Sequence, residues 1–189
     1  MMTFSKLLQN RRAIRDFQAK DVPLETIKEI IQESTLAPSA SNGQPCQFII
    51  VKNKQTMKKL SDESKKNLLQ DFTENKASLN QNYVDMLKNE KFNVFYNAPC
   101  LIYVIGSKSV RSLDVDCALV VSYIMFSAAQ RGLGTCWINL GAYIRDQKIK
   151  AELGIPDDCR IVAPVIIGYP KAIPAPSERN APNILKIVN

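Results

Sequence analysis

Three arginines near the start of the chain, Arg11, Arg12 and Arg15, could together bind an anion that carries several oxygens. Each guanidinium offers a planar fork of hydrogen-bond donors, which suits a phosphate or a carboxylate. The alternative is a solvated edge at a helix end, where Asp16 pairs with Arg15. For an isolated Arg-Arg-x-x-Arg pattern this alternative is the better one, so the cluster needs support from a second feature.

The second feature is the polar segment 38–45, which contains two prolines, a glycine and several amide and hydroxyl side chains and leads into the apolar run 48–51. Its amides and hydroxyls both donate and accept hydrogen bonds, as the binding of a ring with both kinds of edge requires. A helix cap followed by an Asn42-Gly43 turn would explain the same residues without a ligand. Taken together with the arginines, the segment predicts a site for a phosphorylated heterocyclic cofactor.

The composition is typical of a soluble globular protein, with 46% apolar and 23% charged residues, and 189 residues fit a single domain. The chain has no histidine, which excludes His-based triads, His-based proton shuttles and most zinc sites. Five cysteines without C-x-x-C spacing predict no disulfide framework and suit a reducing cytoplasm. Enzyme chemistry would therefore have to come from carboxylates, Lys, Tyr, Cys or a cofactor.

The net charge of +7 indicates either a solvated surface or attraction for phosphate-bearing ligands. A lysine-rich stretch that we expect to be an exposed helix favours the surface, with Lys54, Lys58, Lys59, Lys65 and Lys66. We expect no nucleic-acid partner, because aromatic residues make up only 7% and no helix-turn-helix, zinc-finger or RNP pattern occurs. We also expect no secretory signal and no membrane span. The most apolar segment, 115–129, is interrupted by polar residues and is shorter than the ~20 residues that a span needs.

Hydrophobic spacing and turn residues predict a layered α+β domain, in which helices cover a central sheet. The helix that ends at Gly132 is apolar nearly all round, so we expect it to run through the centre of the fold. Pro164 indicates an edge strand or a bulge, and the proline-rich tail from Pro170 should be extended and docked. We expect helices at 3–10, from 21 to Pro38, 54–70, 76–91, from Asp114 to Gly132 and 145–153, and strands at 48–51, 101–105, 135–138 and 161–167.

Five short motifs occur in order along nearly the whole chain. They are Arg-Arg-x-x-Arg-x-Phe at 11–17, Ala-Pro-Ser-x-x-Asn-x-Gln-Pro at 37–45, Asn-Ala-Pro at 97–99, Gly-Leu-Gly-Thr-Cys-Trp-Ile at 132–138 and Ile-Gly-Tyr-Pro at 167–170. Each motif alone is common, but the ordered set resembles the nitroreductase family of FMN-dependent oxidoreductases. The resemblance implies a three-layer α+β fold with a central, mostly antiparallel sheet flanked by helices. It also implies an intertwined homodimer that binds two FMN molecules at the subunit interface.

The resemblance further implies which residues bind the cofactor. One subunit holds the phosphate, ribityl chain and ring edge with the segment that contains Arg11, Arg12, Ala13 and Arg15. The other subunit approaches the flavin with Pro38, Ser39, Ala40, Asn42 and Gln44. The stretch beside flavin N5 corresponds to Trp137, Ile138, Asn139 and Leu140, although a core strand and its turn would explain these residues as well. Arg179 corresponds to a tail residue that reaches the phosphate, and an exposed tail charge is an equal alternative.

Three departures from the family pattern bear on the site. Ala13 stands where Ser is frequent, so a side-chain contact is missing and only a backbone contact can survive. Cys46 stands where Trp is common, which removes ring surface near the site. Some members supply a basic or amide residue from the middle helices, and this chain has no clear match, with Lys91 and Asn93 as the candidates.

A flavin would supply chemistry that a histidine-free chain lacks. We expect hydride to pass from NAD(P)H to flavin N5 and then to a nitroaromatic, quinone or enone, with both substrates using one cleft in turn. Arg15 would stabilise negative charge at the pyrimidine end of the ring. The alternatives are a different flavin reaction on the same fold, such as dehalogenation or dehydrogenation, a flavin-storing protein without turnover, or a basic nucleic-acid-binding module.

Overall fold

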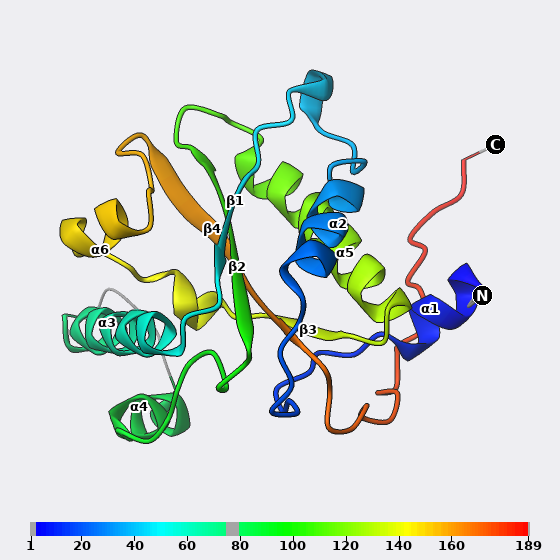
Figure 1. The fold of residues 1–189 in the computed structure, drawn as a ribbon. Helices are drawn as coiled ribbons and strands as arrows, with labels where there is room; N and C mark the ends of the chain where they lie inside the picture. The colour runs from blue at the N-terminus through cyan, green and yellow to red at the C-terminus, as the bar shows by residue number, and fades with distance from the viewer. Residues whose placement is uncertain (1–2, 75–79, 189) are drawn as a thin grey trace.

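The computed structural model describes residues 3–74 and 80–188, and its centre is a four-stranded sheet with the strand order β1-β2-β4-β3 (Figure 1). All three neighbouring strand pairs are antiparallel. The expectation of an antiparallel central sheet is therefore confirmed. The strands are β1 (Gln47–Val51), β2 (Cys100–Ser107), β3 (Gly134–Trp137) and β4 (Cys159–Gly168).

Helices cover both faces of the sheet and complete three layers. One face packs against α2 and α5, and the other packs against α3, α4 and the turn η2 (Figure 1). The helices are α1 (Phe4–Asn10), α2 (Leu24–Ser34), α3 (Lys54–Thr73), α4 (Gln81–Lys88), α5 (Leu113–Gln130) and α6 (Gln147–Glu152), with 3-10 turns η1 (Ala40–Asn42) and η2 (Asn139–Ala142).

The side-chain alternation along β2 explains why the fold has three layers. Leu101, Tyr103 and Ile105 are buried on the side of α3, whereas Ile102 and Val104 are buried on the side of α2 and α5. Because successive side chains of a strand point to opposite faces, a strand that is apolar throughout must be covered on both sides. The phenol of Tyr103 donates to the backbone carbonyl of an η2 residue at 3.0 Å, so this buried hydroxyl is satisfied.

The apolar helix α5 lies on one face of the sheet, so the expectation that it runs through the centre is wrong. Its inward residues Cys117 and Ile124 are fully buried, whereas Val115 and Tyr123 are 64% and 40% exposed. By length and composition α5 could cross a membrane, but here it packs on the sheet as a core helix does. Val115 and Tyr123 on its outer side are left exposed by the described chain, whereas α1 packs near its C-terminal end.

The expectation of an edge strand around Pro164 is wrong, because β4 lies between β2 and β3. The expectation of a bulge is confirmed, since the register between β2 and β4 shifts by one residue at Val162. The Pro164 carbonyl accepts a hydrogen bond from the N–H of Ile138, one residue past the end of β3. Pro164 has no N–H to donate. The position of that missing donor lies opposite Ile138, where the hydrogen bonding between β3 and β4 ends.

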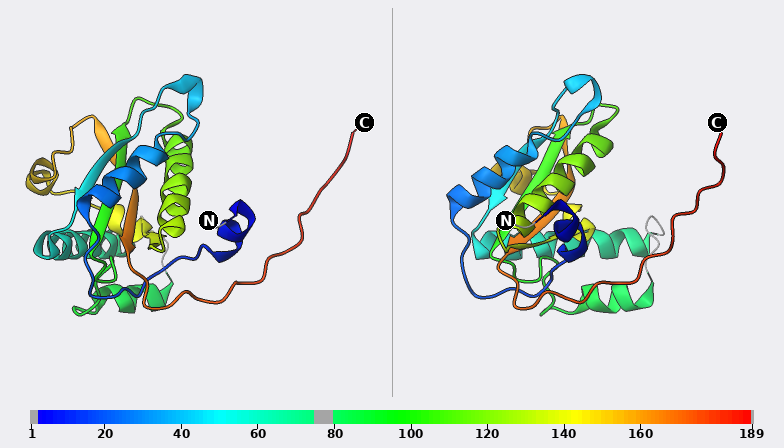
Figure 2. Two further views of the ribbon diagram at one scale, coloured as in Figure 1. Left: turned by 45° about the vertical axis from the view of Figure 1, so that its right-hand side comes forward. Right: turned by 90° about the vertical axis from the view of Figure 1, so that its right-hand side faces the viewer.

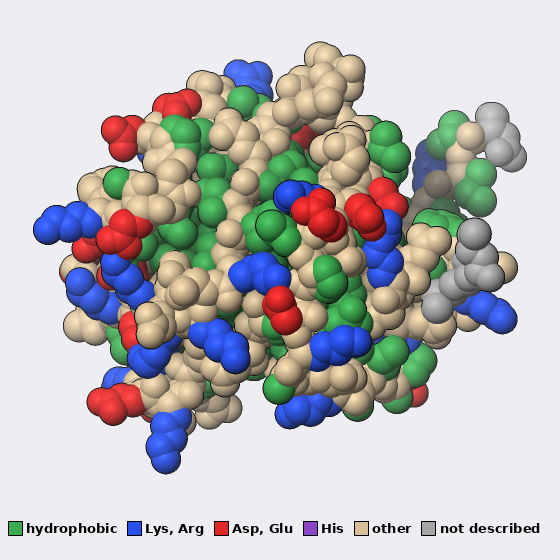
Figure 3. All heavy atoms as spheres, viewed as in Figure 1, with side chains coloured by type: hydrophobic (Ala, Val, Ile, Leu, Met, Phe, Trp, Pro, Cys, Tyr) green, Lys and Arg blue, Asp and Glu red, His purple; other side chains and the backbone are tan. Residues whose placement is uncertain are grey.

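The lysine-rich helix expected at 54–70 is α3, which continues to Thr73. Lysines of this helix form surface ion pairs, such as Lys58 with Asp62. Lys65 differs from the expectation, because it is buried and its ammonium donates to two backbone carbonyls of the loop after α4, at 3.0 Å each. Figure 3 shows Lys and Arg side chains scattered among Asp and Glu on one face rather than gathered in a patch.

The ends of several elements follow the expected stop signals. Gly132 and Gly154 have φ angles of +72° and +69°, as expected for glycines that end α5 and α6. The helix expected at 76–91 ends earlier, at Lys88, and its residues 76–79 lie outside the described residues. The tail after β4 is extended, as expected, but in the described chain it docks on the body only as far as Pro176, and the residues after it project away (Figure 2).

Candidate functional site

The arginine segment is an extended strip that lies along the β3 edge of the sheet. Ala13 pairs with Thr135 in a parallel bridge, and the N–H of Ile14 donates to the Thr135 carbonyl at 2.9 Å. Further along, Phe17 pairs with Pro170. Ile14 and Phe17 are buried in the core, which turns the polar side chains between them outward. The strip thus holds the guanidinium groups along one edge of the sheet.

Two glycines allow this strip to approach the sheet closely. A Cβ atom at Gly134 would lie 2.5 Å from Cγ1 of Ile14, and a Cβ atom at Gly168 would lie 2.8 Å from Cδ1 of Phe17. Both separations are well below the ~3.5–4 Å at which carbon atoms pack. The absence of a side chain at Gly134 and Gly168 is therefore a condition for the position of the arginines.

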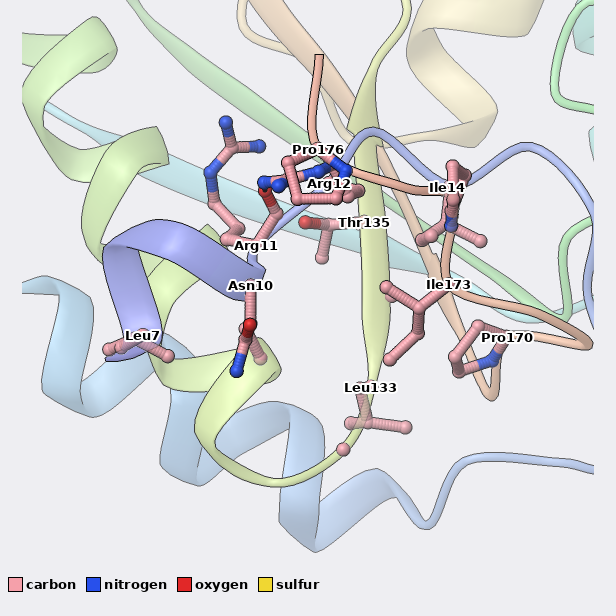
Figure 4. Close-up of a pocket in the computed structure, with 14 residues that line it drawn as sticks. Leu7, Asn10, Arg11, Arg12, Ile14, Leu133, Thr135, Pro170, Ile173 and Pro176 are labelled. Carbon is pink, nitrogen blue, oxygen red and sulfur yellow. Dashed lines mark hydrogen bonds between the residues drawn. The ribbon is translucent and has the colours of Figure 1, made fainter. Parts of the chain in front are cut away.

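A cavity of about 380 Å³ lies between the arginine strip, the β3 edge and the chain that follows β4 (Figure 4). Arg11 and Arg12 supply its charged groups. Its volume falls within the roughly 300–1,000 Å³ of small-molecule sites. A mostly apolar hollow with guanidinium groups suits a ligand that joins an anionic group to an apolar one. The apolar wall consists of Leu7, Ile14, Ala129, Leu133, Pro170, Ile173, Pro174 and Pro176.

Within the described chain, Arg11, Arg12 and Arg15 have no carboxylate partner, unlike the arginines elsewhere that form ion pairs. Asp16, the partner expected for a merely solvated edge, pairs with Lys171 at 2.7 Å instead. Arg12 donates to the backbone carbonyls of Arg11 and Ala175. The positive charge of these three side chains is therefore available to an external anion.

The side chain of Arg15 lies over the aromatic ring of Tyr96, with 5.9 Å between the guanidinium carbon and the ring centroid. Burial raises the pKa of the Tyr96 phenol above its ordinary value of 10.0, although the charge of Arg15 opposes this shift. The phenol is therefore neutral near pH 7. Tyr96 supports the guanidinium without neutralising its charge.

The segment Trp137–Leu140 follows Thr135 directly and lies along the same edge as the arginines. Ile138 is buried and Leu140 is partly buried against the core, whereas Asn139 is exposed at the start of η2. The indole Nε1 of Trp137 is buried without a hydrogen-bond partner among the described residues. The segment therefore offers backbone groups and the Asn139 side chain at the edge.

The polar loop between α2 and β1 has a fixed shape. Ser41, Asn42 and Gln44 adopt φ angles of 50°, 54° and 45°, which are rare for residues other than glycine. Ser39 Oγ accepts a hydrogen bond from the Gln44 N–H at 3.0 Å, and Gln44 Nε2 donates to Asn42 Oδ1 at 3.2 Å. Strain of this kind costs about 1–3 kcal/mol per residue and concentrates at binding and active sites. The local bonds hold the loop in a shape that a ligand need not impose.

A buried carboxylate on α5 anchors this loop. Asp116 is 2% exposed, and its Oδ1 accepts the N–H of Ala40 at 3.0 Å while its Oδ2 accepts the hydroxyl of Ser112 at 2.7 Å. In the sequence, Asp116 falls in the first turn of the helix expected from Asp114 to Gly132. A carboxylate among apolar residues of a helix must find partners when it is buried, and that signal could have identified the anchor.

The loop and the arginines contact α5 at different points. The loop is bound at Asp116, whereas the guanidinium of Arg11 lies 4.0 Å from the sulfur of Met125. At 1.5 Å per residue, the helix between these two contacts spans roughly 14 Å. One copy of the chain therefore brings the arginines together with the β3 edge and the tail, but not with the loop.

Comparison with known protein families accounts for this combination of fold and edge site. The nitroreductase family matches residues 8–169. The chain belongs to the nitroreductase family. This family member is 31% identical over 170 residues to an Archaeoglobus fulgidus protein named "Putative NADH dehydrogenase/NAD(P)H nitroreductase", with 88% of the chain and 84% of the relative covered. It is also 25% identical over 168 residues to the iodotyrosine deiodinase of Thermotoga neapolitana, with 87% of each covered.

Solved structures show the same fold as this nitroreductase-family chain. The nitroreductase of Bacteroides fragilis with bound FMN has a TM-score of 0.84 at 22% identity, with both chains covered completely. An oxidized iodotyrosine deiodinase bound to FMN and 3-iodo-L-tyrosine has a TM-score of 0.78 at 22% identity, with 98% and 100% covered. The expected nitroreductase-like three-layer fold is therefore confirmed.

Several predicted site residues of this family member lie away from the cavity. Arg179 is exposed in the tail and does not line the cavity. Before it, the tail is tied to the body where the Ala175 carbonyl accepts Arg12 Nε at 3.4 Å. Of the candidates between the middle helices, Lys91 is exposed, and Asn93 Oδ1 accepts a local backbone N–H at 2.8 Å.

Four residues that shape the β3 edge and its cavity were not identified as such from the sequence. They are Gly134, Ile173, Pro176 and Tyr96. Gly134 was noted only as part of a motif, although the second glycine of Gly-Leu-Gly beside a strand is a signal for close backbone approach. Ile173 and Pro176 line the cavity; the docking of the tail was expected from its prolines, but not which of its residues dock. Tyr96 had no such signal, because its position depends on a left-handed backbone (φ 53°) that the sequence does not reveal.

Proposed function

We propose that the chain is an FMN-dependent oxidoreductase that passes hydride from NAD(P)H through flavin N5 to a small organic acceptor, such as a nitroaromatic, a quinone or an enone. The proposal describes one FMN-binding domain over residues 1–189, a homodimer and a cytoplasmic protein. The observation that carries it is the set of three guanidinium groups along one sheet edge, without carboxylate partners in the described chain, two of which line an apolar hollow. Family membership and the relatives support the same conclusion.

The donor set at the sheet edge fits FMN, which joins an anionic phosphate to a flat ring with polar edges. Arg11 and Arg12 would hold the phosphate, with Arg179 of the tail as a further cation, and Arg15 would hold the ring edge. The backbone of Trp137–Leu140 would lie beside the ring.

A second copy of the chain would complete the site. The loop residues that would approach the flavin from the partner subunit are Pro38, Ser39, Ala40, Asn42 and Gln44. The separation of loop and arginines along α5 supports this arrangement, because one copy alone does not join them. Exposed apolar side chains on α1 and α5 would also be covered by a second copy. They include Phe4, Leu8, Val115 and Tyr123.

When bound, FMN supplies the hydride chemistry, and the chain's own residues bind and orient. The fixed positive charge of Arg15 would stabilise negative charge at the pyrimidine end of the ring. Backbone groups near Asn139 would orient the ring. The apolar wall would limit the access of water to the hollow. No side chain needs to act as acid or base, because solvent can supply the proton.

The visible spectrum of the purified chain, followed under anaerobic conditions, tests this proposal. We expect flavin absorbance that bleaches with NADH or NADPH and returns when a quinone is added. A colourless protein would overturn FMN binding, and a bound flavin that neither nucleotide bleaches would favour a storage protein. Steady-state rates should follow a ping-pong pattern, which a ternary complex would contradict. Gel filtration should give a dimer, since a monomer with bound flavin would contradict the shared site.

A second candidate reaction on the same scaffold is reductive dehalogenation. The observation that favours it is the similarity to iodotyrosine deiodinases in sequence and in fold. An anaerobic assay with reduced enzyme and 3-iodo-L-tyrosine distinguishes the two candidates. Release of iodide at a rate above that for quinone or nitroaromatic reduction would favour dehalogenation, and no release would remove it.

A further inference from the structure

Two thiols meet where the polar loop joins the body of the protein. The sulfur atoms of Cys46 and Cys117 are 3.4 Å apart. Cys46 follows the loop directly, and Cys117 lies on α5 next to Asp116, the residue that anchors the other part of the loop through Ala40. The loop is thus attached to two adjacent residues of one helix, by a hydrogen bond at one point and by a thiol contact at the other.

The two thiols differ in access to solvent. Cys46 is half-buried and lines a cavity of about 170 Å³ beside Ser39 and Gln44, whereas Cys117 is fully buried. A small oxidant can therefore reach Cys46 first. The contact with Cys117 lowers the pKa of the Cys46 thiol, against the effects of burial and of the Asp116 charge, and it raises the pKa of Cys117. Cys46 is consequently the more nucleophilic of the two.

We propose that Cys46 and Cys117 are a redox modification site, at which hydrogen peroxide produces an intrachain disulfide that ties the polar loop to α5. In the first step the Cys46 sulfur attacks one peroxide oxygen, the O–O bond breaks, and Cys46 sulfenic acid and one water form. In the second step the Cys117 sulfur attacks the sulfenic sulfur, the S–O bond breaks, and the disulfide and a second water form. Two thiols lose two electrons in total, and the peroxide gains them.

The geometry requires little movement for this step. The two sulfur atoms must approach by roughly 1.4 Å to reach covalent distance. The cysteines are 71 positions apart in sequence, so only the folded chain brings them together. The bond would replace a thiol contact beside the Ala40–Asp116 hydrogen bond, so both attachments of the loop would then resist opening. This inference goes beyond the proposed oxidoreductase function and does not depend on it.

Peroxide treatment of the intact, purified chain tests the proposal. We expect the number of thiols that can be alkylated under denaturing conditions to fall from five to three. We expect a cross-linked peptide that joins Cys46 and Cys117, and complete recovery of the thiols with dithiothreitol. Hydrogen exchange at the loop amides should be slower in the oxidised form than in the reduced form. None of these measurements depends on bound flavin, so their failure is distinct from a failure of the oxidoreductase proposal.

Variants of each cysteine complete the test. In Cys46→Ser all four remaining thiols should survive the same treatment. In Cys117→Ala, Cys46 should stop at the sulfenic acid, which dimedone traps. Because Cys117 is buried, that variant can fail to fold, and Cys46→Ser then carries the test alone. The proposal is overturned if the wild-type chain keeps five thiols, if Cys46 is oxidised further while Cys117 stays free, or if the disulfide joins two chains.

Discussion

Arg15 lies over the ring of Tyr96, and the backbone beneath that ring is held in an unusual conformation. Tyr96 and Asn97 have φ angles of 53° and 52°, both in the left-handed region. The turn is fixed by two short hydrogen bonds, from Tyr96 N to the Asn93 carbonyl at 2.8 Å and from Ala98 N to the Phe95 carbonyl at 3.0 Å. Tyr96 and Asn97 thus adopt a strained backbone conformation that places the Tyr96 ring against the Arg15 guanidinium.

Replacing Tyr96 with Leu should weaken the placement of Arg15. A cation–π contact at an exposed site contributes about 0.5–1 kcal/mol, so we expect FMN to bind roughly two- to fivefold more weakly. The midpoint potential of the bound flavin should fall as well. Tyr96→Phe keeps the ring and is the matched control. If Tyr96→Phe weakened binding as much as Tyr96→Leu, the phenol rather than the ring would be the important group.

Replacing Arg15 with Ala should have a larger effect than any change at Tyr96. Loss of a hydrogen bond from a charged group costs about 1.5–3 kcal/mol, which corresponds to FMN binding that is roughly 10- to 150-fold weaker. Reduction of the remaining bound flavin by NAD(P)H should be slower. Arg111→Ala removes the same charge from an exposed position and should leave both quantities unchanged. Cys46→Ala should also leave both nearly intact, and loss of turnover in that variant would indicate a thiol mechanism.

The anchor of the polar loop gives a separate prediction. In Asp116→Ala the Ala40 N–H and the Ser112 hydroxyl lose their bonds to a buried carboxylate, and we expect unfolding to require about 1–3 kcal/mol less free energy. FMN retention in the dimer should fall, because the loop is no longer held. Asp114→Ala is the matched control, since its exposed ion pair with Arg160 should contribute less than about 1 kcal/mol. Urea unfolding and flavin retention after gel filtration measure both effects, and equal losses in the two variants would argue against an anchor.

The strands and most helices could be predicted from the sequence, because their signals are local. Apolar runs such as 101–105 predict a buried strand, and Gly132 and Gly154 end helices through their own φ angles. Which other part of the chain packs against a given helix or strand is not determined by the local sequence of that element. Composition shows that α5 is apolar nearly all round, but not that one side of it, with Val115 and Tyr123, is left uncovered by the described chain.

The candidate site likewise combines features that are local in the sequence with contacts between distant residues. Residue types alone indicated the arginine cluster and the polar loop, since few other groups recognise phosphate and ring edges. The supporting contacts join distant parts of the chain. Ala40 and Asp116 are 76 positions apart, and the thiols of Cys46 and Cys117 are 71 apart. One sequence without its folded topology does not reveal such pairs.

The glycine beneath the arginine strip should be intolerant of a side chain. In Gly134→Ala the new Cβ would overlap Ile14, and we expect a loss of about 1–3 kcal/mol of stability from overpacking. Because the strip must shift outward, FMN affinity should fall as well. Gly154→Ala is the matched control, because Gly154 does not line the cavity, a Cβ there meets nothing within 4 Å and only its positive φ of 69° is unfavourable, at a cost of about 1–2 kcal/mol. That control should keep its FMN affinity, and a fall there would show that the affinity responds to stability alone.

The ion pair between Glu33 and Arg131 should make stability depend on pH in acid. Arg131 Nη1 donates to Glu33 Oε2 at 2.8 Å, and Ser127 donates to the same oxygen at 2.6 Å. Mainly through the Arg131 bond, the pKa of Glu33 is lowered from 4.5 to about 2. Because the folded pKa lies below the unfolded one, the stabilisation is complete above the unfolded value of 4.5. It is lost as the pH falls from there toward 2.

The side chain of Glu33 is 46% exposed, so screening by solvent limits the contribution to less than about 1 kcal/mol. We therefore expect Glu33→Gln to be less stable than the wild type in urea at neutral pH. The difference should shrink once the pH is well below 4.5. Glu25→Gln, which removes an exposed pair with Lys28, is the matched control on the same helix. A difference between wild type and Glu33→Gln that stays constant with pH would show that the pair contributes by packing rather than by charge, since only the charged form of the carboxyl is favoured by Arg131.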